Sequence, residues 1–254
     1  MYAEERKQKI LELIHSSGSM STSELAKSVG ASPITLRKDL AILESMGLVK
    51  RTHGGAISKS LESRMELSFS EKTNFNLEEK VRIARRASEM IQVGDSIILD
   101  AGTTTLQIAK HIKDKIDIHV LTNSVYNLLE LAESEGIEVS LTGGSLRKIS
   151  RSLIGPLAIS SLNSVNAGKL FLGATGVSIE KGLTSPNMVE AQTKSAMIRA
   201  ADTVILVVDH SKFEKTALGK FGEIEEVQIL ITDKKAPSGV IDKIIQKGIE
   251  VIQV

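Results

Sequence analysis

Apolar residues recur at helical spacing near the start of the chain and predict three short helices. The first period, at positions 10–14, indicates a helix over 6–16. A capping-box pattern at 21–24 begins a second helix, because a serine and the glutamate three residues later satisfy each other's backbone N–H groups. A tight turn at 30–31 leads into a third helix that ends near Met46. This order of elements is typical of a helix-turn-helix.

The third predicted helix separates apolar from polar residues. Ser32 is a good N-cap, and Pro33 fits the first helical position. Three apolar residues are predicted to anchor the helix: Ile34, Leu36 and Leu40. Three polar residues remain on its other faces: Thr35, Arg37 and Lys38. Such a helix suits the DNA major groove, where arginine pairs with guanine and threonine contacts a thymine methyl or a phosphate. An ordinary helix with a basic solvent face would look the same, so the neighbouring segments decide between the two.

A two-stranded ribbon follows the third helix. A strand is predicted over 48–52, a turn at 53–55, and a return strand through 56–57. A ribbon with cations and a glycine tip is typical of a wing that lies against the DNA backbone or minor groove. Lys50 and Arg51 are therefore expected to contact phosphate.

The apolar pattern lapses over 58–76, and we interpret this stretch as a linker in which Leu67 and Phe69 can pack. A helix is predicted over 77–91. Apolar strands then alternate with helices. Seven strands are predicted, over 96–100, 118–122, 137–141, 169–173, 203–209, 227–232 and 249–253. This alternation predicts an α/β domain with a mainly parallel sheet covered on both faces.

Ligands of such sheets bind beyond the carboxyl ends of the strands, so the polar residues there are candidates for a site. The first strand ends at Asp100 and continues into a loop of small residues, Gly102, Thr103, Thr104 and Thr105. Free N–H groups and the dipole of the following helix suit a phosphate at this loop. Alternatively, the threonines only cap the helix. The spacing and lysine of a GxxxxGK[ST] nucleotide-binding loop are absent.

Four other strand ends carry polar or glycine-rich loops. The candidate residues in them are Asn123, Gly143, Gly144, Gly173, Thr175, Asp209 and Lys212. Each loop alone is typical of a turn or a helix cap. Five such loops at one edge of a sheet indicate a binding site.

Composition excludes several classes of protein. A chain of 254 residues has room for one small and one medium domain. It contains no cysteine, which excludes disulfides and thiolate chemistry, and its five histidines lack ligand spacing, so no metal site is predicted. The scarcity of aromatic residues, 3%, disfavours base stacking on single strands. A charged N-terminus and the absence of a long apolar run predict a cytoplasmic protein without a membrane segment.

The charge is distributed unevenly along the chain. Residues 1–60 carry a net charge of +3 and the remainder −2, although the whole chain carries only +1. The excess at the N-terminal end favours DNA as a partner, but it is small. Firm DNA binding is therefore expected to need a dimer.

Arg6, Ile10 and Ile14, followed after seventeen residues by S-x-x-T-L-R-K-D-L, resemble the DeoR family of bacterial transcriptional regulators. The resemblance implies that the third helix is the recognition helix and that Asp39 on it has a structural role. The implied DNA-binding residues are Ser32, Thr35, Arg37, Lys38, Lys50, Arg51 and Gly54.

The remainder of the chain resembles the effector domain of that family, which is similar to ribose-5-phosphate isomerase. The chain then divides into a winged helix-turn-helix over 1–57, a linker over 58–76, and an effector-sensing and oligomerisation domain over 77–254. The resemblance implies a phosphorylated sugar or polyol as effector, and no cofactor. The implied effector-binding residues are Asp100, Gly102, Thr103, Thr104, Thr105, Asn123, Gly143, Gly144, Gly173, Thr175, Lys194, Asp209 and Lys212.

A sugar-phosphate isomerase with an attached DNA-binding head is the main alternative. Aldose–ketose isomerisation needs a base beside a carbonyl, and in those enzymes the fourth strand ends in D-G-A-D. Here the matching run, 172–175, reads L-G-A-T and lacks both carboxylates. Many relatives in the regulator family keep an acid where Thr175 stands. Glu190 is a remaining candidate base, but binding without turnover is the preferred interpretation.

A third interpretation is that the domain over 77–254 serves only oligomerisation. It leaves the five polar strand ends unexplained. We therefore expect a homodimer or higher oligomer that binds two half-sites of a duplex operator. The expected function is repression of a carbohydrate or polyol operon. A phosphorylated ligand in the effector-sensing domain would favour an arrangement of the DNA-binding domains that no longer matches the operator. The linker would transmit this change.

Overall fold

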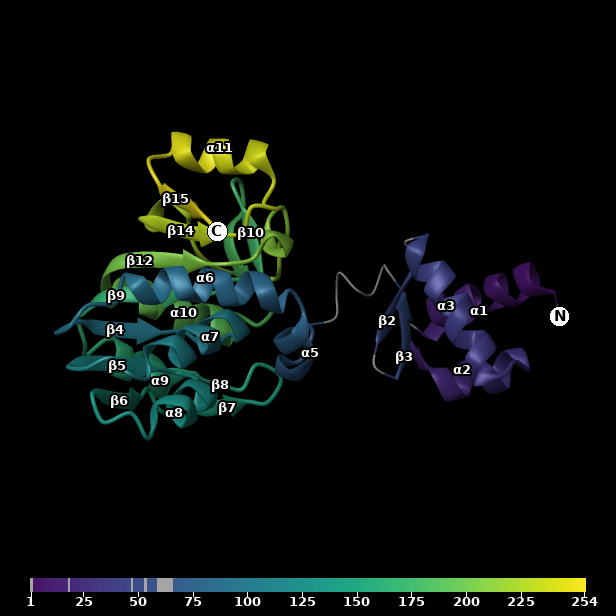
Figure 1. Ribbon diagram of the computed structural model, residues 1–254, viewed down its shortest axis with the longest axis horizontal. Helices are drawn as coiled ribbons and strands as arrows, with labels where there is room; N and C mark the ends of the chain where they lie inside the picture. Colours follow the sequence, from purple (N-terminus) through teal and green to yellow (C-terminus); the bar gives the residue numbers. More distant parts are fainter. Residues whose placement is uncertain (1, 18, 47, 53, 59–65) are drawn as a thin grey trace. The chain divides into compact units, whose positions relative to one another are not determined.

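The computed structural model describes residues 2–17, 19–46, 48–52, 54–58 and 66–254. The chain splits into two compact units, Met1–Glu66 and Leu67–Val254 (Figure 1). This boundary falls inside the stretch that the sequence predicts as a linker. Two parts of the predictions, His53 in the wing turn and residues 59–65 of the linker, lie outside the described residues.

The first unit packs three helices on a three-stranded antiparallel sheet. Its elements are α1 (Ala3–Ser17), β1 (Ser19–Ser21), α2 (Thr22–Val29), α3 (Pro33–Ser45), β2 (Val49–Thr52) and β3 (Gly55–Ser58). The sequence predicts all of them except β1, which pairs with β3 in the sheet order β1-β3-β2. The pairing requires a glycine at position 55, because a Cβ atom there would lie 2.0 Å from the carbonyl oxygen of Met20.

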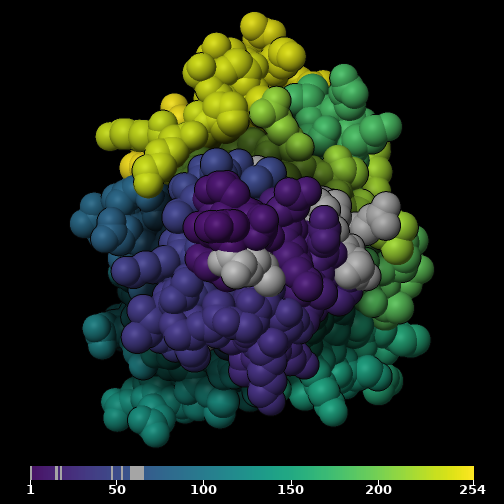
Figure 2. Space-filling view, turned by 90° about the vertical axis from the view of Figure 1, so that its right-hand side faces the viewer, coloured from purple at the N-terminus to yellow at the C-terminus, as the bar shows by residue number. Residues whose placement is uncertain are grey.

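The core of the first unit is made by one apolar stripe from each helix. Ile10 and Ile14 of α1 meet Leu25 of α2 and Leu36 and Leu40 of α3, and all five are at most 1% exposed. Figure 2 shows one face of the outer surface of this unit, in purple.

The prediction that Ile34 anchors the third helix is wrong. Ile34 is 67% exposed, whereas Leu36 is fully buried. Each residue of an α-helix turns the chain by about 100°, so Ile34 lies about 200° away from Leu36 and faces outward. The actual third anchor is Leu43, seven residues after Leu36 and 2% exposed.

The second unit is built on a seven-stranded parallel sheet. Its strands are β4 (Ser96–Leu99), β5 (Ile118–Thr122), β6 (Ile137–Leu141), β9 (Ala167–Leu172), β12 (Ala201–Val207), β14 (Ile229–Thr232) and β15 (Glu250–Gln253). All seven predicted strands are present, within two residues at each end. The sheet order is β15-β14-β12-β9-β4-β5-β6. The strands β5 and β6 are added on one side of β4 and the later strands on its other side, so the order of strand addition reverses between β4 and β9. In open parallel sheets, ligands bind in the crevice at such a reversal point.

Helices cover both faces of this sheet (Figure 1). One face is covered by α6 (Leu77–Glu89), α7 (Thr103–Ile112) and α8 (Val125–Leu131), and the other by α9 (Pro156–Leu162), α10 (Met188–Arg199) and α11 (Ser238–Gln246). Successive strand residues alternate between the two cores: Leu99 packs with α6 and α7, and Ile98 packs with α9 and α10. Burial of both strand faces explains the continuous apolar runs in the sequence. The predicted α/β fold class is confirmed.

The smaller elements of the second unit are not predicted. They are α5 (Phe69–Asn74), the hairpin β7 (Ser145–Arg147) and β8 (Ser152–Ile154), and the small sheet β10 (Gly176–Ser178), β11 (Gly182–Ser185) and β13 (Gly219–Gly222). The linker prediction is therefore corrected over 67–76, which belongs to the second unit and contains α5. A capping box formed by Ser68 and Glu71 begins α5, and burial of Phe69 attaches it to the unit. Among the described residues, no helix is long and apolar enough to cross a membrane.

Candidate functional site

The exposed side of α3 carries the polar residues that the sequence assigns to DNA. Ser32 caps the helix, because its hydroxyl accepts a hydrogen bond from the Thr35 N–H at 3.2 Å. Arg37 and Lys38 are exposed, and Thr35 is partly exposed. Ile34 adds an apolar side chain to this outward surface. Hydroxyl, cationic and apolar groups are together the set that reads base edges in the major groove.

Two hydrogen bonds fix the wing against the helices. The Glu44 carboxylate on α3 accepts a hydrogen bond from the Arg51 N–H on β2 at 2.9 Å. The Thr22 N–H at the start of α2 donates to the Gly54 carbonyl at 2.7 Å. Arg51 and Gly54 are exposed, and Lys50 is partly buried. The seven predicted DNA-binding residues thus lie on α3, its N-cap and the wing attached to it.

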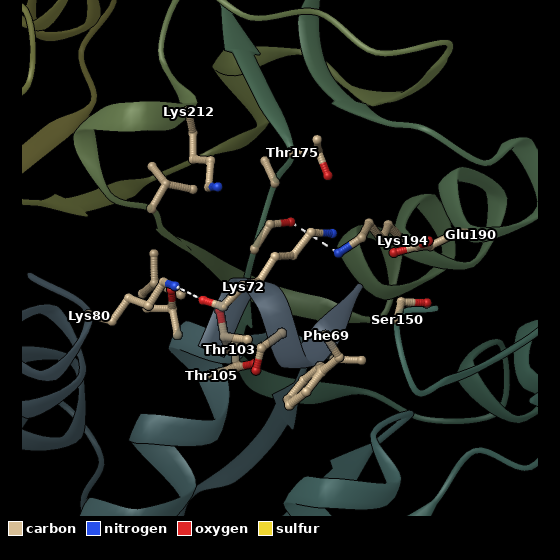
Figure 3. A pocket seen from close by; sticks show the side chains of 17 residues that line it. Phe69, Lys72, Lys80, Thr103, Thr105, Ser150, Thr175, Glu190, Lys194 and Lys212 are labelled. Carbon is tan, nitrogen blue, oxygen red and sulfur yellow. Dashed lines mark hydrogen bonds between the residues drawn. The ribbon is translucent and has the colours of Figure 1, made fainter. Parts of the chain in front are cut away.

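The second unit contains a pocket at the reversal point of its sheet. Asp100 follows β4 and Gly173 follows β9, and the Asp100 carboxylate accepts a hydrogen bond from the Gly173 N–H at 3.0 Å. Gly173 lines the pocket, which Figure 3 shows from close by. Its lining residues are Phe69, Lys72, Lys80, Ala101, Gly102, Thr103, Thr104, Thr105, Ser150, Gly173, Ala174, Thr175, Glu190, Lys194, Val207, Val208 and Lys212.

The N-terminus of α7 forms one wall of the pocket. Gly102 is the N-cap and no side chain caps the helix. The Thr105 hydroxyl donates to the Gly102 carbonyl at 3.0 Å, and among the described residues no threonine hydroxyl accepts a hydrogen bond from a first-turn N–H group. The interpretation of the threonines as caps is therefore not supported. The first turn presents N–H groups and the positive end of a helix dipole to the pocket.

Besides Lys194, three lysines line the pocket, and each comes from a different element. Lys72 comes from α5, Lys80 from α6, and Lys212 from the short 3₁₀ helix His210–Lys212 that follows β12 (Figure 3). Lys80 is only 2% exposed. Its burial lowers the pKa of Lys80 to about 8; nearby Lys212 and Lys72 contribute to the shift, and the Asp209 carboxylate opposes it.

The opposite wall carries paired charges. The Lys194 ammonium forms a buried ion pair with Asp100 and donates to the Gly173 carbonyl at 3.0 Å. The Glu190 carboxylate lies 3.2 Å from an Arg147 guanidinium nitrogen. The same Arg147 nitrogen donates to the Ser150 hydroxyl at 3.1 Å. This end therefore offers hydrogen-bonding groups whose charges largely compensate one another.

Eight of the thirteen predicted effector residues line the pocket, and five do not. Asp100 and Asp209 are fully buried behind the wall, and Asn123 is 1% exposed. The Asn123 side chain braces the α7 loop, because its Oδ1 accepts from the Ala101 N–H at 2.8 Å. Asp209 accepts hydrogen bonds from the Asn76 side chain at 2.8 Å and the Ser211 N–H at 3.0 Å. Burial would raise the pKa of Asp209, but Lys212 and these hydrogen bonds lower it below its usual value.

The glycine pair 143–144 has a structural explanation. Both residues have positive φ, 68° at Gly143 and 114° at Gly144. A Cβ atom on Gly144 would lie 2.7 Å from the Ile154 carbonyl oxygen. Glycine is therefore required for the turn into the β7–β8 hairpin.

The lining residues that the sequence analysis missed come mainly from outside the strand-end loops. Phe69 and Lys72 lie on α5, Lys80 on α6, and Ser150 in the β7–β8 turn. A signal for Lys80 is present in the sequence. It lies three and four residues before Ile83 and Ala84, so it occupies the apolar stripe of α6 where a cation is costly to bury.

Comparison with known families accounts for both units. Residues 6–62 match the DeoR-like helix-turn-helix domain, and residues 75–234 match the DeoR C terminal sensor domain. The chain belongs to the DeoR family of transcriptional regulators. It is therefore a regulator with a DNA-binding helix-turn-helix, as the recognition-helix motif predicts.

Relatives in the DeoR family match over nearly the whole chain. The HTH-type transcriptional regulator GlpR of Haloferax volcanii is 38% identical, covering 99% of this chain and 98% of that protein. A putative aga operon transcriptional repressor of Escherichia coli O157:H7 is 35% identical, over 98% and 93%. The HTH-type transcriptional repressor GlcR of Bacillus subtilis is 35% identical, over 99% and 96%.

Solved structures with a partial likeness to the chain include ribose 5-phosphate isomerase A from Methanocaldococcus jannaschii. The two are 17% identical, with a TM-score of 0.41, over 54% of this chain and 55% of that chain. At this TM-score, the likeness carries no argument about function.

Proposed function

We propose that the protein is a repressor of a carbohydrate or polyol operon whose release from DNA is caused by a phosphorylated sugar or polyol bound in the second unit. The observation that carries this proposal is the pocket at the reversal point of the sheet. The uncapped N-terminus of α7 lines this pocket together with three lysines, of which Lys80 is buried. Fixed N–H groups together with several ammonium groups suit a doubly charged anion such as a phosphate ester.

The other end of the pocket suits the remainder of such a ligand. Ion pairs between Lys194 and Asp100 and between Glu190 and Arg147 supply donors and acceptors without a large net charge. A neutral polyhydroxyl chain attached to a phosphate fits this distribution. No cofactor is proposed.

DNA binding is assigned to the first unit. Arg37, Lys38 and Thr35 would contact base edges, with Ile34 beside them, while Arg51 and the wing tip would contact the backbone. The net charge of the N-terminal 60 residues is only +3, which is small for binding that depends on phosphate contacts. We therefore propose a homodimer or higher oligomer that places two recognition helices on two half-sites.

Turnover of the ligand is not proposed. The loop after β9 contains Ala174 and Thr175, neither of which is a useful base at neutral pH. Glu190 is the only carboxylate among the described lining residues, and a guanidinium nitrogen of Arg147 already engages it at 3.2 Å. Glu190 is the remaining candidate base for the enzyme alternative, which is tested by assaying turnover of a panel of sugar phosphates. Conversion of any of them would favour that alternative.

The proposal is tested with a duplex that the wild-type chain selects from a random-sequence DNA library. Gel shifts on that duplex are titrated with a panel of phosphorylated sugars and polyols, after a thermal-shift screen identifies binders. Lys212→Met and Thr104→Val each remove a polar group from the phosphate end and are expected to lose ligand-dependent release. Lys215→Met is the matched control, because Lys215 is exposed three residues away and does not line the pocket.

Each variant is compared with its own ligand-free DNA affinity. Normal release in both pocket variants would mean that the ligand binds elsewhere. Arg37→Ala tests the DNA half separately and is expected to weaken binding of the selected duplex by about 1–3 kcal/mol. Unchanged affinity would remove Arg37 from the DNA-reading surface.

A further inference from the structure

The first helix of the second unit is part of the pocket wall. The helix α5 begins at Phe69, three residues after the first unit ends at Glu66. Phe69 and Lys72 both line the pocket, and the Lys72 side chain extends into it (Figure 3). Any ligand that fills the pocket therefore meets a helix that is joined by a short stretch of chain to the DNA-binding unit.

The two ends of α5 are held by different kinds of contact. At its start, the Phe69 N–H donates to the Ile149 carbonyl at 2.8 Å, and the Phe69 ring stacks on Tyr126 with centroids 4.6 Å apart. At its end, the Lys80 ammonium donates to the carbonyls of Lys72 and Phe75. The start is held by contacts with α8 and the β7–β8 turn. The end is held by a cation that also lines the pocket.

The Lys80 ammonium is available to an anion as well as to α5. An ammonium group has three N–H donors, and two of them point to the carbonyls at the end of α5. Among the described residues, the Lys80 ammonium contacts these two carbonyls, and the carboxylates of Asp209 and Glu79 act on it at longer range. A buried ammonium held only by carbonyl dipoles gains strongly from a directly contacting anion, because the surroundings screen the charge weakly.

A second contact links the same end of α5 to the phosphate end of the pocket. Asn76, between α5 and α6, has a φ of 52°, and its side chain donates to Asp209 at 2.8 Å. The other carboxylate oxygen of Asp209 is buried without a hydrogen-bond partner among the described residues. Asp209 begins the turn that carries Lys212. A shift of this turn on ligand binding would therefore reach Asn76.

We propose that Lys80 is the residue that couples the pocket to α5: an anion at the N-terminus of α7 is held by the same ammonium that holds the end of α5, so occupancy fixes α5, the first helix after the DNA-binding unit. This inference rests on the proposed function, since it requires that the pocket binds an anionic ligand. Lys80 acts as a positioning residue for α5. Lys80 contacts α5 and lines the pocket, and the test of coupling measures α5 directly.

The experiment follows amide hydrogen exchange in the full chain, with and without saturating inorganic phosphate. In the wild type, phosphate is expected to slow exchange in residues 67–76 at least about threefold. Lys80→Met removes the ammonium and keeps a long apolar stem for the buried position. This variant is expected to bind phosphate more weakly, through α7 and Lys212, and at saturation to show no phosphate-dependent change in residues 67–76.

Lys72→Met is the matched control. It also removes one ammonium from the pocket, but it keeps the backbone carbonyl that Lys80 holds. It is therefore expected to bind phosphate more weakly and yet to retain the protection of α5 at saturation. If Lys80→Met does not fold, Lys80→Gln replaces it, since glutamine keeps a donor for one carbonyl and loses the charge.

The outcomes separate this proposal from the proposed function. If phosphate neither raises the melting temperature of the wild type nor changes its amide hydrogen exchange, the proposed anion site is wrong. The proposed coupling is then excluded as well. Binding of phosphate without protection of residues 67–76 in the wild type would overturn the coupling alone. Full protection in a folded Lys80 variant would also overturn it, because α5 would then respond through another residue.

Discussion

Arg6 on α1 and Asp39 on α3 form an ion pair with two hydrogen bonds inside the first unit. Arg6 Nε donates to Asp39 Oδ2 at 2.6 Å, and Nη2 donates to Oδ1 at 3.3 Å. The hydrogen bond to Asp39 raises the pKa of Arg6 above its ordinary value. Asp39 is the only acid in the recognition segment 32–40 and is 5% exposed. The pair thus fixes α3 on α1 and leaves its outward side cationic.

Replacement of Asp39 by asparagine tests this role. Asp39→Asn keeps the shape of the side chain and removes the charge that the Arg6 guanidinium pairs with. We expect faster hydrogen exchange in α1 and α3 of the full chain and no gain in affinity for the selected duplex. Glu12→Gln is the control, because Glu12 is an exposed acid on α1. A clear gain in DNA affinity with Asp39→Asn alone would mean that the acid faces DNA.

Ile34 and Leu36 are expected to respond to alanine in opposite ways. Leu36 is fully buried, so Leu36→Ala should destabilise the first unit by about 2–5 kcal/mol. Ile34 is 67% exposed, and Ile34→Ala should change stability by at most about 0.5 kcal/mol.

We expect the exposed Ile34 side chain to contribute to DNA binding instead. It lies on the same side of α3 as Arg37 and Lys38, three and four residues later, where an apolar side chain can contact a thymine methyl. Ile34→Ala should therefore weaken binding of the selected duplex, measured by gel shift. A stability loss comparable to that of Leu36→Ala would contradict the outward orientation.

The large elements could be predicted because burial leaves a clear periodic pattern. Strands buried on both faces are continuous apolar runs, and Ser32, Pro33 and the 21–24 capping box mark helix starts directly. Ile34 is apolar but does not anchor α3, because its angle around the helix turns it away from Leu36. The strand β1 and the helix α5 are too short for a period, and tertiary contacts determine both of them.

The candidate site could be predicted only where it follows the strands. Parallel strands bring their carboxyl ends together, which places Thr103, Gly173 and Lys212 in one pocket. Lys72 reaches the same pocket from α5, and one sequence does not reveal that this segment folds back over the sheet edge. Whether a polar residue lines the pocket or braces its wall, as Asn123 does, depends on side-chain direction that strand positions do not give.

The buried pair of Asp100 and Lys194 is expected to be strongly non-additive. The two side chains are 1% and 5% exposed, so removal of one leaves the other charge buried without its partner. Asp100→Asn should destabilise the second unit by about 3–5 kcal/mol, as should Lys194→Met. The double variant should cost clearly less than the sum of the two, because no uncompensated charge remains. Urea unfolding of all four proteins measures the coupling, and additive losses would contradict a direct pair.

The charge of Lys80 predicts how anion binding depends on pH. With a pKa of about 8, the free protein loses this ammonium charge as pH rises through that value, whereas a bound anion favours the charged form. The affinity for sulfate, which keeps both charges throughout, should therefore fall above about pH 8, by at most about tenfold per pH unit. Calorimetric titrations between about pH 7 and 9.5 measure the slope.

Two variants identify the group that titrates. The charged groups around Lys80 are Asp209, Lys212, Lys72 and Glu79. Lys80→Met should bind sulfate more weakly and without the fall above pH 8. Lys212→Met removes a neighbouring cation that lowers the pKa of Lys80, so the fall should move to higher pH. A wild-type slope that persists in Lys80→Met would assign the titration to another group in the pocket.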